Sequence, residues 1–257
     1  MSERRWLLAV AVGASLVVSP SPSVAGVYEV RACDAADGVN NSWHPLPART
    51  GVSSAVACPS NGHRRRGLSA RNAIAQSGGR TYAKRGAIAG LAFTAPPDAA
   101  IVGVRGGYYF YRSDPSWQAV LTNGFQVIKG CHHGQFACES VASNRFLTTP
   151  PTPVLVVAVH CNATRCPTTR TGDRTRGSLQ ALATLYSAVV SIEDDTNPSI
   201  TNLGGAAVAD GWHSGKQPLT FAATDNSGIA HTRVLAGETT LLSNPKTCDF
   251  TRPSPCP

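Results

Sequence analysis

The sequence predicts an all-β protein built from antiparallel sheets, with one β-sandwich followed by a second, incomplete one. Runs with a period of two recur along the chain, and turns containing Pro, Gly or Asn separate them. The chain has 257 residues, of which 24 are Gly and 18 are Pro, and 15% are charged. This composition argues against a coiled coil or a helical bundle, and the hydrophobic fraction of 42% argues against global disorder.

Residues 1–25 are predicted to be a secretory signal peptide. Basic residues precede an apolar run of 13 residues, Trp6 to Val18, and Ser23-Val24-Ala25 places small residues where a signal peptidase cuts. As a helix this run covers ~20 Å, less than the ~30 Å hydrocarbon core of a membrane. We therefore expect cleavage after Ala25, a secreted, extracellular mature chain from Gly26, and no transmembrane segment in that mature chain.

Eight cysteines in an exported chain indicate a disulfide framework. Pairing of sequence neighbours predicts four bonds: Cys33–Cys58, Cys131–Cys138, Cys161–Cys166 and Cys248–Cys256. Three of these bonds would close hairpin-sized loops, which contribute on the order of 2–3 kcal/mol each. Zinc at Cys131-His132-His133 and Cys138 is the alternative, but the spacing matches no usual zinc finger, so no metal site is expected.

The first predicted domain, residues 26–193, is a jelly-roll-like antiparallel β-sandwich. Its strands are expected at 27–31, 88–94, 101–112, 117–121, 125–129, 154–161 and 178–193. The last is expected to be one long strand, because small and apolar residues recur along it with a period of two. Residues 34–87 are expected to contain long loops and short strands.

Turn residues predict how some of these strands connect. Pro96 and Pro97 end the strand 88–94, which is expected to pair with 101–112 after the turn. The Asn123-Gly124 dipeptide predicts a hairpin. The run 154–161 is apolar without interruption, which predicts a strand buried on both faces.

Residues 194–197 are predicted to be a linker, because two acidic residues precede an Asn-Pro step. Four short strands are expected after it, at 199–202, 218–223, 229–235 and 239–242. An immunoglobulin-type sandwich has about seven strands and ~100 residues. Residues 198–257 are therefore predicted to be an incomplete Ig-like domain with an unpaired edge, completed by further sequence in longer relatives.

Six segments carry a resemblance: Cys33-Asp34, Gly38–Trp43, Cys58-Pro59, Phe93–Pro97, Leu185–Ala188 and Asp225–Ile229. In these the chain is similar to a group of uncharacterised secreted proteins of soil actinobacteria, in which a lectin-like jelly-roll domain is followed by bacterial Ig-like domains. The resemblance spans nearly the whole mature chain but brings no established catalytic or ligand-binding residues. The group usually continues past a segment similar to Cys248–Pro253, which implies a fragment or a shortened member.

The sequence favours binding over catalysis. The mature chain has four Glu and ten Asp, most of them beside turn or linker residues, and no pair stands out as the two carboxylates of a glycosidase. A Gly-x-Ser-x-Gly elbow, a phosphate loop and a dinucleotide fingerprint are all missing from the sequence. We therefore expect a protein without catalytic residues. The alternative is a secreted hydrolase, a glycosidase or esterase, whose catalytic residues are unrecognised.

Aromatic residues provide the candidate carbohydrate contacts. In the segment Tyr108–Tyr111, the alternation of a strand sends Tyr109 and Tyr111 to one face. Exposed rings of this kind stack on the C–H faces of sugars, whereas the alternative is that both faces are buried. Trp43 and Trp117 are further candidates, with a plug at the sandwich edge as their alternative. The expected function is a secreted adhesion or carbohydrate-binding module that recognises an extracellular glycan or cell-surface polymer.

The run Arg64-Arg65-Arg66 is the centre of the densest positive patch in a chain of net charge +8. Outside a cell, its candidate partners are anionic polymers such as teichoic acids or acidic polysaccharides, and the alternative is a solvated loop. Only Tyr82 lies among the basic residues that follow, so specific nucleic-acid recognition is not expected.

Calcium is the one cofactor for which the sequence offers candidate ligands. Acidic corners at domain junctions supply the oxygen ligands that calcium prefers. The linker Asp194-Asp195 and the turn Asp225-Asn226 are such corners, with ordinary turn chemistry as the favoured interpretation.

Overall fold

The chain is all-β in the computed structural model, which describes residues 26–34, 38–48, 51–60, 66–72, 82–131, 138, 140–168 and 179–256, without the side chains of 140–144. The predicted signal peptide lies outside these residues. Across the described part, the one helical element is a single 3₁₀ turn, η1 (Ala206–Val208), and no helix there is long and apolar enough to cross a membrane. Antiparallel sheets make up the rest of the regular structure, which confirms the predicted class.

The larger sheet has seven strands: β1 (Gly26–Ala32), β3 (Val52–Ala57), β4 (Gly67–Asn72), β7 (Ala99–Arg112), β10 (Ser140–Thr152), β13 (Ala181–Leu185) and β14 (Ala188–Asp194). Its centre is β7. One edge of β7 pairs with β13 and β14 in succession, and β10 pairs with the other edge. The sheet then continues from β13 to β4 and β3, and from β14 to β1.

The long strand predicted at 178–193 is present as these two pieces, β13 and β14. The break falls at Tyr186 and Ser187, but the amide of Tyr186 still donates to the carbonyl of Gly107 at 2.8 Å. Both pieces therefore pair with the same edge of β7.

The second sheet has five strands in the order β2 (Trp43–Pro45), β6 (Ile88–Thr94), β11 (Val154–Cys161), β8 (Trp117–Thr122) and β9 (Val127–Cys131). The predicted hairpin is confirmed as β8 and β9. In its turn, Asn123 accepts hydrogen bonds on Oδ1 from the amides of Phe125 and Gln126. A small separate ladder joins β5 (Tyr82–Lys84) to β12 (Arg165–Pro167).

Two sequence-based expectations about pairing and burial are wrong. Strand β6 does not pair with β7, because the Pro-rich turn between them carries the chain from one sheet to the other, and β6 pairs with β2 and β11 instead. Strand β11 is not buried on both faces. Leu155, Val157 and Val159 are fully buried where they face the larger sheet, whereas Val156 and His160 on the outer face are partly exposed.

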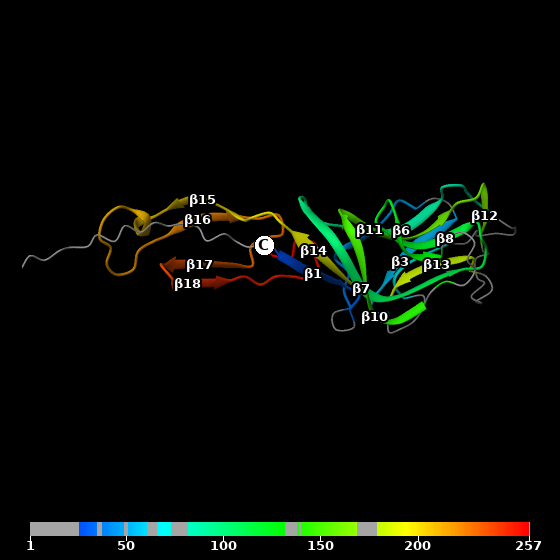
Figure 1. Cartoon of the computed structure of the whole chain (residues 1–257), viewed down its shortest axis with the longest axis horizontal. Helices are drawn as coiled ribbons and strands as arrows, with labels where there is room; N and C mark the ends of the chain where they lie inside the picture. The colour runs from blue at the N-terminus through cyan, green and yellow to red at the C-terminus, as the bar shows by residue number, and fades with distance from the viewer. Residues whose placement is uncertain are drawn as a thin grey trace, which may run out of the picture.

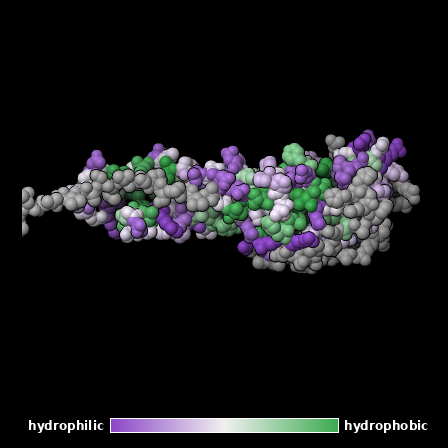
Figure 2. Space-filling model, viewed as in Figure 1, coloured by the Kyte–Doolittle hydropathy of each residue, from purple (hydrophilic) through white to green (hydrophobic). Residues whose placement is uncertain are grey.

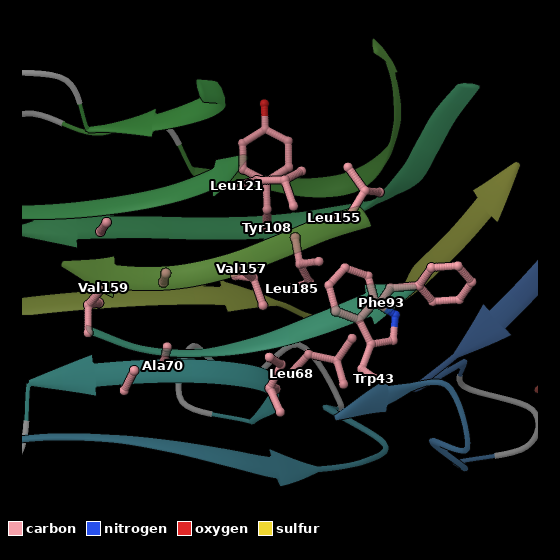
Figure 3. Close-up of a cluster of buried hydrophobic side chains, with 14 of the residues drawn as sticks. Trp43, Leu68, Ala70, Phe93, Tyr108, Leu121, Leu155, Val157, Val159 and Leu185 are labelled. Atoms are coloured by element: carbon pink, nitrogen blue, oxygen red, sulfur yellow. The ribbon is translucent and has the colours of Figure 1, made fainter. Parts of the chain in front are cut away.

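The core lies between the two sheets (Figure 3). Strand β4 packs against β6 and β11, and β13 packs against β8 and β11. Trp43 packs on Phe93, with ring centroids 5.7 Å apart, and Leu68 and Leu155 belong to the same buried cluster. Residues far apart in the sequence thus pack into one continuous apolar layer.

The four strands predicted after the linker are present as β15 (Ser199–Gly204), β16 (Thr220–Thr224), β17 (His231–Ala236) and β18 (Thr239–Pro245). They form two separate two-stranded ladders, β15 with β16 and β17 with β18, which extend from one end of the sandwich (Figure 1). Among residues 198–256, Pro255 alone is buried. Hydrophobic residues reach the surface here (Figure 2), and Leu241 is 65% exposed.

We predict that these C-terminal strands are less stable than the sandwich. A two-stranded ladder buries too little apolar area to offset the entropy of ordering its chain. In native-state hydrogen exchange, amides of residues 218–242 should therefore exchange about tenfold faster, or more, than those of 181–194. Equal protection of the two segments would contradict the prediction, and the amides of β7 provide the internal reference.

All four predicted disulfides are present: Cys33–Cys58, Cys131–Cys138, Cys161–Cys166 and Cys248–Cys256. The last closes the segment that we call the C-terminal loop, residues 248–256. This loop contacts the sandwich at β1: the amide of Arg31 donates to the carbonyl of Phe250, and the hydroxyl of Tyr28 donates to the carbonyl of Pro253, both at 2.8 Å. The loop therefore ties the C-terminal part of the chain to β1 of the larger sheet.

A second contact between the two parts centres on Asn226. Its side-chain amide donates to the carbonyl of Pro97 at 2.7 Å and to the Oδ1 of Asp194 at 3.1 Å. Burial acts to raise the pKa of Asp194, but hydrogen bonds from Ser227, Thr196 and Asn226 outweigh it and hold that pKa below its ordinary value. The carboxylate thus stays ionised at neutral pH and fixes the linker.

Candidate functional site

The outer face of the seven-stranded sheet carries the predicted tyrosine pair. Tyr109 and Tyr111 are both partly exposed, and their rings are parallel within 4° with centroids 6.4 Å apart. The intervening residues of the segment, Tyr108 and Phe110, are each 1% exposed and lie in the core. The predicted alternation of β7 thus places Tyr108 and Phe110 in the core and leaves Tyr109 and Tyr111 partly exposed, which differs from the alternative that both faces are buried.

The spacing of the two rings limits how a ligand could contact them. A flat group held between two rings needs about 3.5–4 Å on each side, or about 7–8 Å in all. Because the centroids are 6.4 Å apart, a sugar does not fit between them and would lie against an outer ring face or across the hydroxyl edges. Thr184 and Leu182, opposite them on β13, share this face of the sheet and are buried.

Trp43 and Trp117 are not available to a ligand. Their exposed fractions are 1% and 0%, because both rings fill the space between the two sheets. The indole Nε1–H of Trp117 donates to the carbonyl of Pro167 at 2.8 Å. The structure thus corrects their candidacy as ligand contacts in favour of the alternative reading, a plug in the sandwich.

The basic candidates are only partly covered by the structure. Arg66 is exposed immediately before β4, whereas Arg64 and Arg65 lie outside the described residues. On the outer face of the larger sheet, Arg105 forms an ion pair with Glu29, with its Nη2 at 3.0 and 3.1 Å from the two carboxylate oxygens. The charge of Arg105 is therefore already balanced within the protein.

Several carboxylates are engaged in structural bonds. Asp114 accepts hydrogen bonds from the amide and hydroxyl of Ser116, and Asp225 accepts one from the hydroxyl of Ser227. Together with the Glu29 ion pair and the bonds of Asp194, these contacts give the acidic groups architectural roles.

The corner proposed for calcium contains Asp194, Asp225 and Asn226. Protein donors already bond to one of its carboxylate oxygens, since Oδ1 of Asp194 accepts from Asn226 and from the amide of Thr196. In the described part of the chain, no cluster of three or more His, Cys, Asp or Glu residues is placed to hold a metal ion. The oxygens at this corner serve the junction between the two parts of the chain.

Sequence analysis missed an open groove beside the C-terminal loop, which we call the junction groove. Its volume is about 670 Å³, and it is lined by Arg31, Val39, Asn41, Asp249, Phe250 and Thr251. Nothing in the local sequence points to it, because its two walls come from segments about 210 residues apart, which the Asn41–Thr251 hydrogen bond of 2.8 Å links.

A smaller groove of about 450 Å³ lies on the outer face of the five-stranded sheet, where Arg85, His160 and Asn162 line it. Burial lowers the pKa of His160, so its ring is neutral at pH 7. The adjacent Cys161 is bonded to Cys166 and offers no thiolate. These groups do not form the nucleophile and base of a hydrolase.

Comparison with protein-family models, with curated proteins and with solved structures found no match to this chain. The geometry of the described surfaces is therefore what distinguishes the candidate functions. Two of them combine aromatic and polar groups: the Tyr109–Tyr111 surface and the junction groove.

Proposed function

We propose that the protein is a secreted, non-catalytic module that binds carbohydrate outside the cell, with the Tyr109–Tyr111 surface as its binding site. The observation that carries this proposal is the parallel, partly exposed ring pair on the outer face of a rigid sheet. Tyrosine rings on a strand are held in place, so stacking a sugar on them costs little ordering entropy. The phenol hydroxyl of Tyr111 can add a hydrogen bond at the ring edge.

Secretion belongs to the same proposal and has indirect support. Four disulfides are typical of proteins that fold in an oxidising compartment outside the cytoplasm. The proposal also treats residues 26–193 as a lectin-like jelly roll and 198–257 as an Ig-like unit, the arrangement found in the secreted actinobacterial proteins that the sequence resembles. The extended form of the C-terminal strands suits a spacer that presents the sandwich to a surface (Figure 1).

The test is a glycan array with the mature chain, residues 26–257, together with a broad glycosidase and esterase screen. We expect array hits without turnover. Replacing both Tyr109 and Tyr111 with Ala should weaken binding about tenfold, because each lost ring contact is worth about 0.5–1.5 kcal/mol. Replacing Tyr111 with Phe should retain most of the binding, since the stacking face remains.

Tyr82→Ala is the matched control, because Tyr82 is 48% exposed on β5, in a separate ladder. This variant should bind as the unmodified chain does. Unchanged binding in the double Tyr variant would exclude the tyrosine surface as the site. Turnover of any substrate in the screen would instead support the hydrolase alternative.

A further inference from the structure

The junction groove contains one cation that the rest of the described chain leaves without a side-chain partner, Arg31. The acid in the same groove, Asp249, is already satisfied: it accepts hydrogen bonds from the amide and hydroxyl of Thr251, and it forms a 3.0 Å ion pair with Arg252. Arg31 is exposed, and its guanidinium presents a planar fork of donors. A ligand with an anionic group would accept hydrogen bonds from these donors and balance the charge of Arg31.

The groove also offers an apolar contact beside the cation. Phe250 is 46% exposed and Val39 is 39% exposed, although both line the cavity. An aromatic ring packs on the C–H face of a sugar ring, and an aliphatic side chain extends that contact. Asn41, which uses its amide nitrogen to reach Thr251, keeps a carbonyl oxygen that can accept from a hydroxyl group.

Both walls of the groove are held in place before any ligand arrives. One wall, at Val39, is tied to β1 by the hydrogen bond from the amide of Cys33 to the carbonyl of Val39, at 2.8 Å. Cys33 is bonded to Cys58, and the opposite wall is closed by the Cys248–Cys256 bond. A site fixed by two disulfides loses little conformational entropy on binding.

From these observations we propose that the junction groove binds an acidic sugar, whose anionic group pairs with Arg31 while its C–H face packs on Phe250. A guanidinium binds carboxylate and related anions through two parallel hydrogen bonds, which fixes the orientation of the ligand. The volume of about 670 Å³ lies within the ~300–1,000 Å³ typical of small-molecule sites, and such sites are frequent where two units meet. This site is separate from the Tyr109–Tyr111 surface and does not depend on it.

The experiment is titration calorimetry of the mature chain with digalacturonic acid and with an uncharged galactose disaccharide. We expect the acidic sugar to bind and the uncharged one to bind at least about tenfold more weakly. Arg31→Gln should weaken binding of the acidic sugar at least about tenfold, and Phe250→Leu should weaken it several-fold. Equal binding of the two sugars, or unchanged binding in Arg31→Gln, would overturn the proposal.

Arg165→Gln is the matched control, since Arg165 is an exposed strand residue on β12 and its loss removes the same charge. It should leave binding of the acidic sugar unchanged, as should the double Tyr109 and Tyr111 variant. Loss of that binding in the double Tyr variant, with retention in Arg31→Gln, would assign the acidic sugar to the tyrosine surface and overturn the groove.

Two further ligands identify the anion. A sulfated galactose disaccharide that binds less well than digalacturonic acid would assign the carboxylate as the recognised group, and equal binding would assign negative charge on a sugar. Either result supports the groove as an acidic-sugar site. Inorganic sulfate that binds as tightly as the sugars would overturn the sugar contact with Phe250.

Discussion

Trp117→Ala should lower the free energy of unfolding by about 4 kcal/mol, because truncation of a fully buried Trp leaves a cavity that the surrounding sheets cannot fill. The ring of Trp117 is 0% exposed, and its removal also leaves the carbonyl of Pro167 without its donor. The loss is a large fraction of the ~5–15 kcal/mol typical of a folded domain. Urea unfolding should show a lower midpoint with an unchanged slope.

Trp212→Ala is the control for this change of residue. Trp212 is 96% exposed, so the variant should stay within about 0.5 kcal/mol of the unmodified chain. Glycan binding per folded Trp117→Ala molecule should be unaffected, because the ring cannot touch a ligand. A loss of glycan binding without a loss of stability would show that Trp117 contacts the ligand.

Replacing both Cys248 and Cys256 with Ser should release the C-terminal strands from the sandwich. In the chain-entropy model, a loop of this length contributes about 2.5 kcal/mol, a large amount for strands that bury so little apolar area. The contacts of Phe250 and Pro253 with β1 should be lost in the same step. Small-angle scattering should report a larger radius of gyration, and proteases should cut residues 198–247 more rapidly.

The matched control replaces Cys131 and Cys138 with Ser. Their sequence separation is 7, against 8 for Cys248 and Cys256, so the loss of loop entropy is similar. Because that bond lies within the sandwich, its removal should lower the sandwich melting temperature and leave the C-terminal contacts intact. Scattering and proteolysis that change equally in both variants would show that the C-terminal loop holds no contact between the two parts.

Local patterns predicted the elements that depend on local residues. The alternation in β7 predicted that Tyr109 and Tyr111 lie on one face of the sheet, Asn123-Gly124 predicted the β8–β9 hairpin, and neighbour pairing predicted the four disulfides. Each follows from the side-chain period of a strand or from the short distance between neighbours. Strand pairing did not follow in the same way, because apolar runs such as β6 and β7 suit either sheet and only long-range packing decides between them.

Two further features were not predicted from the sequence, because polar or charged residues occupy positions in a sheet or in the core. Strand β10 is polar and contains Pro150-Pro151, but it lies at the edge of its sheet and its pairing shifts register across the two prolines. Arg112 is charged, yet it is 1% exposed, and its Nη1 donates to the carbonyl of Trp117 at 3.0 Å. In both cases hydrogen bonds satisfy the backbone or side-chain groups and outweigh the local preference, with a partner strand in β10 and with a nearby carbonyl in Arg112.

The contact between the C-terminal loop and β1 also affects how copies of this protein meet one another. Strand β1 is an outer strand of its sheet, and an uncovered strand edge offers unpaired amides and carbonyls to strands of other molecules. The carbonyl of Phe250 accepts from the outward amide of Arg31, and the carbonyl of Pro253 accepts from the hydroxyl of Tyr28. By holding this loop in place, the Cys248–Cys256 bond therefore reduces edge-to-edge aggregation of the sandwich. Loss of the bond would expose the edge of β1 and release the C-terminal strands together.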